Sequence, residues 1–510
     1  MVKGKSAATL VVAGVSFAIV AAEPQTTAVV NVDLTQDLGP IRVMNAVNNG
    51  PSVSKAGDDQ KRGNFDTYQA ARIPYARTHD SVNCVSGGAH TCDIGAIFPD
   101  FDADENDPRN YDFVFTDHYL DTIRRAGTEV YYRLGQTIEH GPKKYGSLPP
   151  KDFAKWARIC EHVIRHYNEG WGWGLDNAYT TRNIAWSNQF NIVYWEIWNE
   201  PDLDAMPGDE VSRNPRCWGG SVTNFFRFFS TAAKHLKSRF PQLKIGGPAL
   251  AGRWDFAENL LAYCRDEKVP LDFFSWHWYS VDPATAGEFC DQARGLLDKY
   301  GYGKTESILN EWNYVKGWSD DFVYSMEVES GRFNQKCAAF IATTMTVCQS
   351  KPLDMLMFYD ARTTTVMNSL FDGVTLLPLR GYYPFYAWSK LTDCGRQVAC
   401  SVKEGRGTRA GAASGVAVGQ KETTVKNQYH AVAAKGAGGS GAVLITRYSS
   451  DDNCSDTGKV WVSVPGVDLS KARCHMTDAV RIHTEVPLSF ASDGAAVFSL
   501  QPNSFALIEF

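Results

Sequence analysis

The sequence has little that would suit a nucleic-acid or membrane surface. It contains no long basic run, and its formal net charge is −6 at pH 7, which gives no electrostatic footprint for nucleic acid or anionic lipid. Beyond the first 22 residues, no apolar run is long enough to cross a bilayer. No Cys/His cluster has zinc-site spacing. We therefore expect no nucleic-acid partner, no membrane span, no catalytic metal and no cofactor.

The N-terminal segment, residues 1–22, has the pattern of a secretory signal peptide. Lys3 and Lys5 precede an apolar stretch that closes with Val20-Ala21-Ala22, a small-residue cleavage pattern. The apolar stretch, about 16 residues, is short for a membrane span. We therefore expect a chain that is exported to the periplasm or the extracellular space.

Twelve cysteines in an exported chain indicate disulfides. Connectivity cannot be deduced from sequence, but local spacing favours three pairs: Cys84–Cys92, Cys394–Cys400 and Cys454–Cys474. Four more cysteines lie in helical patterns, where buried free thiols are an equal alternative: Cys160, Cys264, Cys337 and Cys348.

Strand-like and helix-like segments alternate between residues 40 and 391. The predicted strands cover residues 41–47, 75–80, 129–134, 192–199, 244–249, 273–279, 307–311 and 353–359. The predicted helices cover residues 65–72, 115–126, 151–167, 223–239, 256–267, 285–300, 330–349 and 383–391. Such alternation predicts an α/β fold, a (β/α)8 TIM barrel. The long insertions follow strands, which enlarges the face where barrel active sites lie.

The chain changes character after residue 391. Two segments are rich in Gly, Ala and Ser, residues 405–419 and 434–441, and read as loops. Short alternating stretches predict strands at residues 442–448, 460–464, 495–500 and 505–510. We predict an all-β sandwich domain over residues 392–510, joined by strands from residues 23–39, beside a barrel over residues 40–391.

Two carboxylates end predicted barrel strands among aromatic and amide side chains. Residues 195–203 read WEIWNEPDL, and residues 309–313 read LNEWN. Paired carboxylates are the minimum equipment for cleaving a glycosidic bond, because one protonates the leaving oxygen and the other attacks or stabilises the anomeric carbon. Asn199 suits a donor to a sugar 2-hydroxyl, and the flanking tryptophans, Trp312 among them, suit stacking on sugar rings.

The first of these segments resembles the acid/base segment of glycoside hydrolase family 39, which contains β-xylosidases, α-L-iduronidases and related exo-glycosidases. Three other stretches are similar to that family: RTHD at 77–80, PPKD at 149–152 and HYNEGW at 166–171. The resemblance implies a retaining mechanism on a barrel with a β-sandwich. It also implies that Glu200 is the general acid/base, ending the fourth strand, and that Glu311 is the nucleophile, ending the seventh.

Two other glutamates compete with this pair. Glu306 shares a strand with Glu311 but lies at its beginning, on the opposite barrel face, and Glu196 lies too deep in the fourth strand to reach the cleft. Glu311 must be ionised to attack, so it needs donors such as Tyr279 or an arginine. Glu200 must hold its proton, which an apolar wall and a negative neighbour favour.

Polar residues at other strand ends are candidates for substrate binding. His277 is expected to contact substrate or to position a carboxylate, and Arg77 to brace the nucleophile. His79 and Asp80, which end the second strand, are further candidates. The remaining candidates, for which loop or cap roles are an equal alternative, are Asn45, Asn48, Asn49, Gln136, Glu139 and His140.

The end of the eighth predicted strand departs from the family pattern. Family β-xylosidases carry an acidic pair there, whereas residues 358–365 read FYDARTTT. Arg362 would suit a uronic acid, or it pairs with Asp360, which we favour. The sequence therefore predicts a secreted, retaining, β-xylosidase-like exo-glycosidase with a carbohydrate substrate. The alternatives are an α-L-arabinofuranosidase, galactosidase or uronidase of the same family, or a catalytically silent carbohydrate-binding protein.

Overall fold

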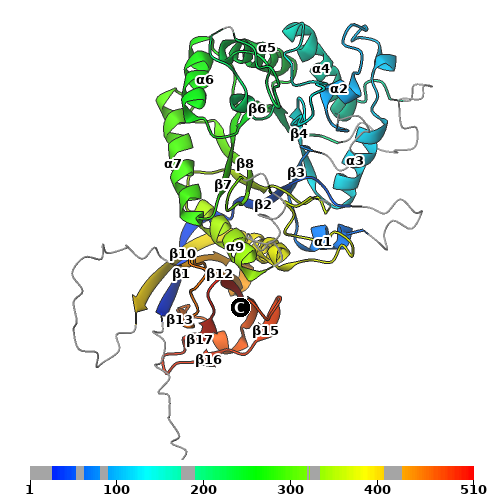
Figure 1. The fold of residues 1–510 in the computed structure, drawn as a ribbon. Helices are drawn as coiled ribbons and strands as arrows, with labels where there is room; N and C mark the ends of the chain where they lie inside the picture. The colour runs from blue at the N-terminus through cyan, green and yellow to red at the C-terminus, as the bar shows by residue number, and fades with distance from the viewer. Residues whose placement is uncertain are drawn as a thin grey trace, which may run out of the picture.

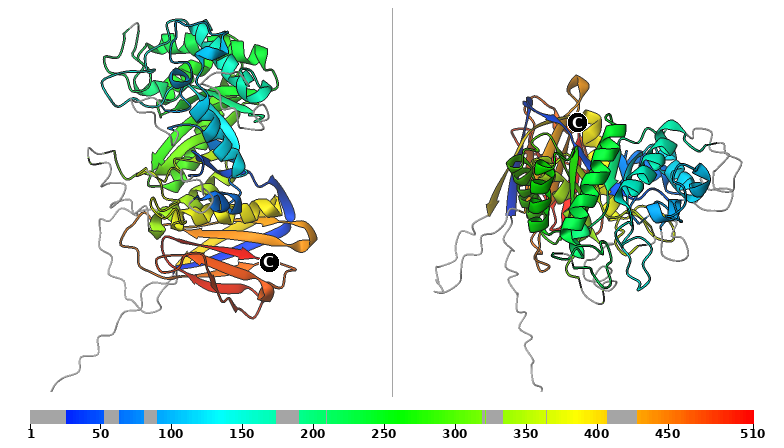
Figure 2. Two further views of the ribbon diagram at one scale, coloured as in Figure 1. Left: turned by 90° about the vertical axis from the view of Figure 1, so that its right-hand side faces the viewer. Right: turned by 90° about the horizontal axis from the view of Figure 1, so that it is seen from above.

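The computed structural model describes residues 26–52, 63–80, 90–173, 190–208, 210–318, 321, 334–363, 365–406 and 428–510. The expected signal peptide, residues 1–22, lies outside the described residues. The chain forms a closed barrel and a separate β-sheet domain that stand side by side (Figure 1). The same two parts are seen from the side and from above in Figure 2.

The barrel consists of parallel strands that pair in chain order and close from the last strand back to the first. This confirms the predicted (β/α)8 fold. The strands are β2 (Val43–Asn48), β3 (Tyr75–Arg77), β4 (Glu129–Leu134), β5 (Tyr194–Ile197), β6 (Lys244–Leu250), β7 (Phe273–Ser280), β8 (Glu306–Tyr314) and β9 (Met355–Phe358).

Helices follow the strands and cover the outside of the barrel (Figure 1). They are α1 (Phe65–Ala70), α3 (Val114–Arg125), α4 (Phe153–Glu169), α5 (Val222–Arg239), α6 (Trp254–Asp266), α7 (Pro283–Lys299), α9 (Gln335–Gln349) and α10 (Tyr383–Cys394), with a short α2 (Ile94–Ile97) in the insertion after β3. Several helices start where a polar side chain accepts a hydrogen bond from the first turn, as Asp152 does from the Lys155 N–H and Ser221 from the Asn224 N–H.

The barrel interior is apolar at its N-terminal end. Inward side chains from six strands form one buried cluster there: Ala46, Tyr131, Tyr194, Phe273, Ile308, Met355 and Met357. Because neighbouring strand residues point to opposite faces, the residues between them pack outward against the helices, as Trp195 and Phe274 do. This cluster closes the lower end, so a ligand can enter the barrel only from the C-terminal end of the strands.

The second domain is one ten-stranded sheet. Its strands are β1 (Thr26–Pro40), β10 (Arg396–Arg406), β11 (Tyr429–Lys435), β12 (Gly441–Arg447), β13 (Gly458–Ser463), β14 (Arg473–Thr477), β15 (Thr484–Val486), β16 (Ser489–Phe490), β17 (Ala496–Leu500) and β18 (Ser504–Glu509). Strand β1 runs antiparallel to β10 and parallel to β13. Residues from both halves of the sheet, such as Val460 and Ile508, share one buried core, so the sheet curls on itself like a sandwich.

The two domains are joined by packing between helices and strands. Helices α9 and α10 lie against β11 and β12, and the Thr343 hydroxyl donates to the Thr446 hydroxyl at 2.9 Å. In the described part of the chain, none of the helices has both the length and the apolar character needed to cross a bilayer.

The predicted disulfides within the described residues are absent. Cys394, Cys400, Cys454 and Cys474 are free thiols, and the proposed pair Cys84–Cys92 includes Cys84, which lies outside the described residues. Cys394 packs against the barrel core, whereas Cys400 packs against the core of the sheet domain. Although Cys394 and Cys400 are close in sequence, their thiols therefore lie against different cores. Buried thiols are found at Cys160, Cys264 and Cys348.

Candidate active site

Glu200 and Glu311 meet inside the C-terminal end of the barrel. Glu200 follows β5, and its backbone N–H donates to the Ala249 carbonyl at 2.9 Å; Glu311 lies on β8. Their side chains line one cavity of about 750 Å³, and a carboxylate oxygen of each lies within 4.8 Å of the other. An oxygen–oxygen approach this close is compatible with the carboxyl separation of retaining glycosidases, about 5–5.5 Å, and is shorter than the ~6.5–9.5 Å that leaves room for a water.

A β-bulge turns Glu311 into the barrel. Trp276 of β7 pairs with Leu309 of β8, but His277 pairs with Glu311, so Asn310 is an extra residue. As a result Asn310 and Glu311 both point inward: the Asn310 amide donates to Glu196 at 2.5 Å, and Glu311 faces the cavity. Bulges next to active sites commonly re-aim a side chain in this way.

Strained backbone lies close to the cavity, at the ends of β3, β5 and β6. Four non-glycine residues there have positive φ, namely Asp80, Trp198, Glu200 and Ala249, and Asp80 and Glu200 line the cavity. Such conformations cost on the order of 1–2 kcal/mol each and persist where the surrounding structure imposes them, commonly at functional sites. They coincide here with the ends of β3, β5 and β6, next to the two carboxylates.

Each oxygen of Glu311 accepts a hydrogen bond. The Arg77 guanidinium donates to Oε1 at 2.6 Å, and the Tyr279 hydroxyl donates to Oε2 at 2.8 Å. Burial raises the pKa of Glu311, while Arg77 and Tyr279 oppose that rise. Arg77 and Tyr279 thus favour the ionised form that a nucleophile requires, and both contacts were predicted from the sequence.

Glu200 is also buried, but the charge with the largest effect on it is negative rather than positive. Burial and the negative charge of Asp202 raise the pKa of Glu200 to about 8, so the carboxyl is protonated at neutral pH. His277 Nδ1 lies 2.8 Å from Glu200 Oε1, and burial lowers the pKa of His277 to about 4. His277 is therefore a neutral positioning partner of Glu200, which has the protonation state of a general acid.

A buried network holds Arg77 beneath the two carboxylates. Arg77 Nε donates to Glu196 at 2.6 Å, and its other nitrogens donate to Asn48 at 3.0 Å and Asn199 at 2.7 Å. Glu196 also accepts from the Tyr131 hydroxyl at 3.2 Å. Glu196 is fully buried and balances the charge of Arg77. It is not among the residues that line the cavity, as its depth in the strand predicted.

Several buried polar atoms around the carboxylates have no hydrogen-bond partner among the described residues: both ring nitrogens of His79, Asp80 Oδ1, Asn199 Nδ2 and His277 Nε2. His79 Nε2 lies 3.6 Å from both Glu311 Oε1 and Asp80 Oδ1. Buried polar groups are normally satisfied, so donors and acceptors left open in one place match a ligand rich in hydroxyl groups.

Arg362 is fully engaged by its own neighbours. It donates to Asp360 from Nε at 2.8 Å and from a terminal nitrogen at 2.6 Å. It also donates to the Asp80 carbonyl at 2.7 Å and to the Tyr359 hydroxyl at 2.9 Å. No donor pair is left for the carboxylate of a uronic acid. The pairing with Asp360 that we favoured is the one present.

Three predicted substrate-binding residues lie elsewhere. Trp312 points away from Glu311 and is buried against Phe340 and Phe358, because neighbouring residues of a strand face opposite ways. Asn45 is buried, and its amide donates to the Ala71 and Arg72 carbonyls. Both are structural.

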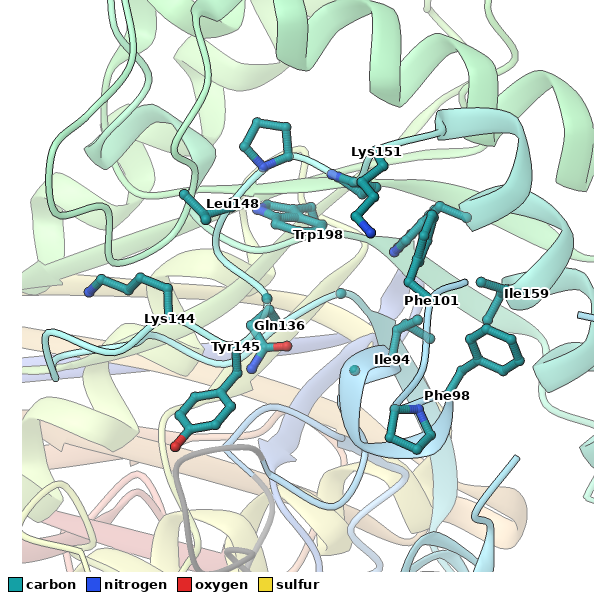
Figure 3. Close-up of a pocket in the computed structure, with 17 residues that line it drawn as sticks. Ile94, Phe98, Phe101, Gln136, Lys144, Tyr145, Leu148, Lys151, Ile159 and Trp198 are labelled. Atoms are coloured by element: carbon teal, nitrogen blue, oxygen red, sulfur yellow. The ribbon is translucent and has the colours of Figure 1, made fainter. Parts of the chain in front are cut away.

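Gln136 is the third, and it lines a different cavity of about 310 Å³ behind the β4–α4 loop (Figure 3). Its amide donates to Asp93 at 2.9 Å. Glu139 is also structural, because its carboxylate accepts from the backbone N–H groups of Tyr145, Gly146 and Ser147 and so fixes that loop. His140 does line the catalytic cavity.

Sequence reasoning missed the outer wall of the catalytic cavity. This wall contains Ile138, Leu203, Arg216, Trp318, Val366 and Met367. These residues come from irregular loops after four different strands, where no periodicity marks them. Trp318 stands edge-on to Tyr279, with ring centroids 5.2 Å apart. Its only signal in the sequence was an aromatic residue seven positions after Glu311.

Glu200, His277 and Glu311 also form a group whose spacing could hold a metal ion. No such cluster was expected from the sequence. The Arg77 guanidinium, 2.6 Å from Glu311, places a fixed positive charge where a cation would bind and therefore disfavours one. Proton and glycosyl transfer fit this arrangement better than metal binding.

Comparison with known proteins places the chain among glycosidases. The profile of glycosyl hydrolases family 39 matches residues 29–300, which is 272 of 510 residues. A β-xylosidase from Caldicellulosiruptor saccharolyticus is 26% identical over 184 residues, 34% of this chain and 32% of that protein. The match thus spans about a third of the length of that curated relative.

Two solved structures share the fold over nearly the whole chain. A glucosidase from Croceicoccus marinus gives a TM-score of 0.66 at 20% identity, covering 95% of this chain and 98% of that one. A monomeric β-xylosidase from Caulobacter crescentus gives a TM-score of 0.64 at 14% identity, covering 94% and 99%. At such identities the likeness establishes the barrel with its β domain and nothing finer.

Proposed function

The chain belongs to glycosyl hydrolases family 39, and from this we propose that it is a retaining, β-xylosidase-like exo-glycosidase. The observation that carries the proposal is the buried pair of Glu200 and Glu311, of which one oxygen each lies within 4.8 Å of the other. Burial and Asp202 raise the pKa of Glu200 to about 8, whereas Arg77 and Tyr279 donate hydrogen bonds to Glu311. That pair also argues against a catalytically silent carbohydrate-binding protein on the same scaffold.

The proposed reaction has two steps. In the first, a Glu311 oxygen attacks the anomeric carbon while Glu200 gives its proton to the glycosidic oxygen, and the aglycone leaves as an alcohol. In the second, Glu200 takes a proton from water, the water oxygen bonds to the anomeric carbon, and Glu311 leaves as a carboxylate. Two inversions restore the original anomeric configuration.

The proposed donor is a neutral terminal sugar. The cavity ends at the buried Arg77 network, which supports binding of a chain end rather than passage of a chain. The open donors and acceptors at His79, Asp80, Asn199 and His277 supply hydroxyl-binding groups at the inner end. Arg362 offers no free fork for a carboxylate, and Asp80 adds negative charge, so a uronide is disfavoured.

The test is a panel of aryl glycosides with matched leaving groups: β-xyloside, α-L-arabinofuranoside, β-galactoside and β-glucuronide. We expect the xyloside to have the largest kcat/KM and the first-formed product to be the β-anomer by NMR. A uronide preference of more than about tenfold, which is roughly 1.4 kcal/mol in the transition state, would overturn the neutral-sugar assignment. An α-anomer would overturn retention.

We also propose that the protein is exported. The support is the pattern of residues 1–22, with two lysines before an apolar stretch that closes in small residues. Expression of the full-length chain with N-terminal sequencing of the secreted product tests this. The expected mature terminus is Glu23, and an intact N-terminus in the cytosolic fraction would contradict export.

A further inference from the structure

We propose that the aglycone half of the catalytic cavity is built for an apolar aryl or alkyl group rather than for a second sugar. This inference rests on the proposed retaining glycosidase function and names the class of leaving group that the site accepts. It concerns the outer wall of the cavity, whose apolar residues are Ile138, Leu203, Trp318, Val366 and Met367 and which also contains Arg216.

The cavity is polar at its inner end and apolar at its outer wall. The buried atoms without partners gather around Glu311 and Asp80, where the terminal sugar would lie. The outer wall consists mainly of aliphatic and aromatic side chains from the loops after β4, β5, β8 and β9, and its polar lining residues are His140, Arg216 and Thr365. A sugar at this wall would find few protein partners for its hydroxyl groups, whereas an apolar group would gain from covering the exposed apolar surface.

Two of these wall residues are exposed although they are large and apolar. Leu203 is 41% exposed and Trp318 is 65% exposed. Leu203 lies three residues after Glu200, on the 3-10 turn Pro201–Leu203, beside the group that protonates the leaving oxygen. The Trp318 ring contacts the Tyr279 ring edge-on, and the Tyr279 hydroxyl donates to Glu311. Exposed apolar side chains that gather at a cavity mouth mark a ligand surface.

Part of the outer wall belongs to a separate small hydrophobic cluster. Val315 and Met367 are buried together, with Tyr279, Tyr359 and Val366 packed against them. This cluster is distinct from the main barrel core, so its side chains form the cavity wall itself. The cavity of about 750 Å³ has room for a sugar ring together with a further group of similar size.

A retaining enzyme allows this wall to be tested without changing the leaving group. The glycosyl-enzyme formed from 4-nitrophenyl β-xyloside is attacked either by water or by an added alcohol. The alcohol oxygen bonds to the anomeric carbon, Glu200 takes its proton, and Glu311 leaves as a carboxylate. The ratio of alkyl xyloside to free xylose then reports how well the acceptor occupies the aglycone half of the cavity.

The acceptors are ethanol, 1-butanol, 1-hexanol and xylose at equal concentration. A fully buried methylene strengthens binding by about fourfold, and a partly buried one by less. We expect the transfer ratio to rise about twofold per added carbon and to be at least about tenfold larger for 1-hexanol than for xylose. A flat alcohol series, or xylose as the better acceptor, overturns the proposal.

Variants assign the effect to the wall. Leu203→Asn and Trp318→Ala should each lower the 1-hexanol transfer ratio by about threefold or more while leaving the ethanol ratio unchanged. The matched control is Val480→Asn, which alters an 83% exposed apolar residue of the sheet domain and should leave every ratio unchanged. A chain that turns over no glycoside overturns both proposals, whereas turnover with a sugar acceptor preferred overturns this one alone.

Discussion

The two ends of the barrel use the same strands in opposite ways. At the N-terminal end, β5 contributes Tyr194 and β8 contributes Glu306, whose carboxylate accepts from the Tyr194 hydroxyl and pairs with Lys244. At the C-terminal end, the same strands lead to Glu200 and Glu311, which are buried beside polar atoms without partners. The lower end therefore serves stability, and the upper end stores unfavourable interactions that a substrate can relieve.

This contrast predicts different costs for changes at the two ends. A change at the upper end should lower activity and cost little stability, whereas a change at the lower end should do the reverse. Glu306 and Glu311 allow the sharpest form of this comparison, because they are glutamates at opposite ends of one strand.

The largest expected effect is that of Glu311→Ala. Without a nucleophile no glycosyl-enzyme forms, so kcat should fall on the order of 10⁵-fold or more for every substrate, as expected when a covalent nucleophile is removed. Single-turnover assays with 4-nitrophenyl β-xyloside measure it. Glu306→Gln is the matched control: kcat should stay within about twofold, and the free energy of unfolding should fall by no more than about 1 kcal/mol. Equal loss of activity in both variants would contradict the comparison.

Glu200→Ala should lose activity in a way that depends on the leaving group. We expect a loss on the order of 10²–10⁴-fold on substrates with poor leaving groups and a smaller loss of glycosylation on activated aryl glycosides, which need little protonation. Azide should partly restore turnover and yield a glycosyl azide. The measurement is a plot of log kcat/KM against leaving-group pKa. If its slope is the same as in the wild type, Glu200 is not the acid.

Phe273→Ala tests the lower end. Phe273 is fully buried in the lower cluster, and removal of a buried aromatic ring costs about 3–5 kcal/mol of unfolding free energy. Urea denaturation followed by tryptophan fluorescence measures that cost. Activity per folded molecule, measured well below the melting temperature, should be unchanged. A drop in kcat beyond the loss of folded protein would show that the two ends are coupled.

Relative to the wild type, Glu200→Gln should become more stable as the pH rises. Burial and Asp202 raise the pKa of Glu200 to about 8, so between its unfolded pKa and pH 8 the folded protein binds a proton that the unfolded chain has released. Wild-type stability therefore falls across that window, by at most about 1.4 kcal/mol per pH unit. The glutamine variant lacks this term. The difference in melting temperature between Glu200→Gln and wild type should grow from pH 5 to pH 8 and level off above it.

The pKa of Glu200 also limits activity at alkaline pH. This is the smallest of the expected effects, because at neutral pH Glu200 still holds its proton. The general acid must be protonated, so kcat/KM of the wild type should fall as the pH rises through about 8. Below that value this limb should be flat. If kcat/KM instead fell as the pH rose through about 5, Glu200 would already be ionised at neutral pH in the free enzyme, and the assigned environment would be contradicted.

Much of the fold could be read from the sequence. The alternation of short apolar runs and helical patterns predicted the barrel, since each βα unit needs only local periodicity and an adjacent partner strand. Glu129–Leu134 was predicted with the bounds that β4 has. In the sheet domain β10, β11, β14, β15 and β16 were not predicted. Which of their side chains are buried depends on the distant strands that pair with them, and not on local alternation.

The motif around Glu200 also pointed to the family that the family model matches, because such a motif resides in a few adjacent residues. Arg77 and Tyr279 were assigned to Glu311, and the structure places both in hydrogen-bonding contact with it. The cysteine pairs show the limit of such local reasoning. Only five residues lie between Cys394 and Cys400, yet the chain passes from a barrel helix into the sheet domain between them.

What the sequence alone determined was which residue types lie at which strand, because periodicity and motifs are properties of neighbouring positions. What only the tertiary structure decided was where those side chains point and what surrounds them. Simple alternation from the inward Ile308 would send Asn310 inward and Glu311 outward. The bulge between β7 and β8 brings Glu311 inward as well and leaves Trp312 facing the helices. That bulge arises from pairing between strands about 30 residues apart, and the apolar outer wall arises from loops of four strands, so neither could be inferred from adjacent residues.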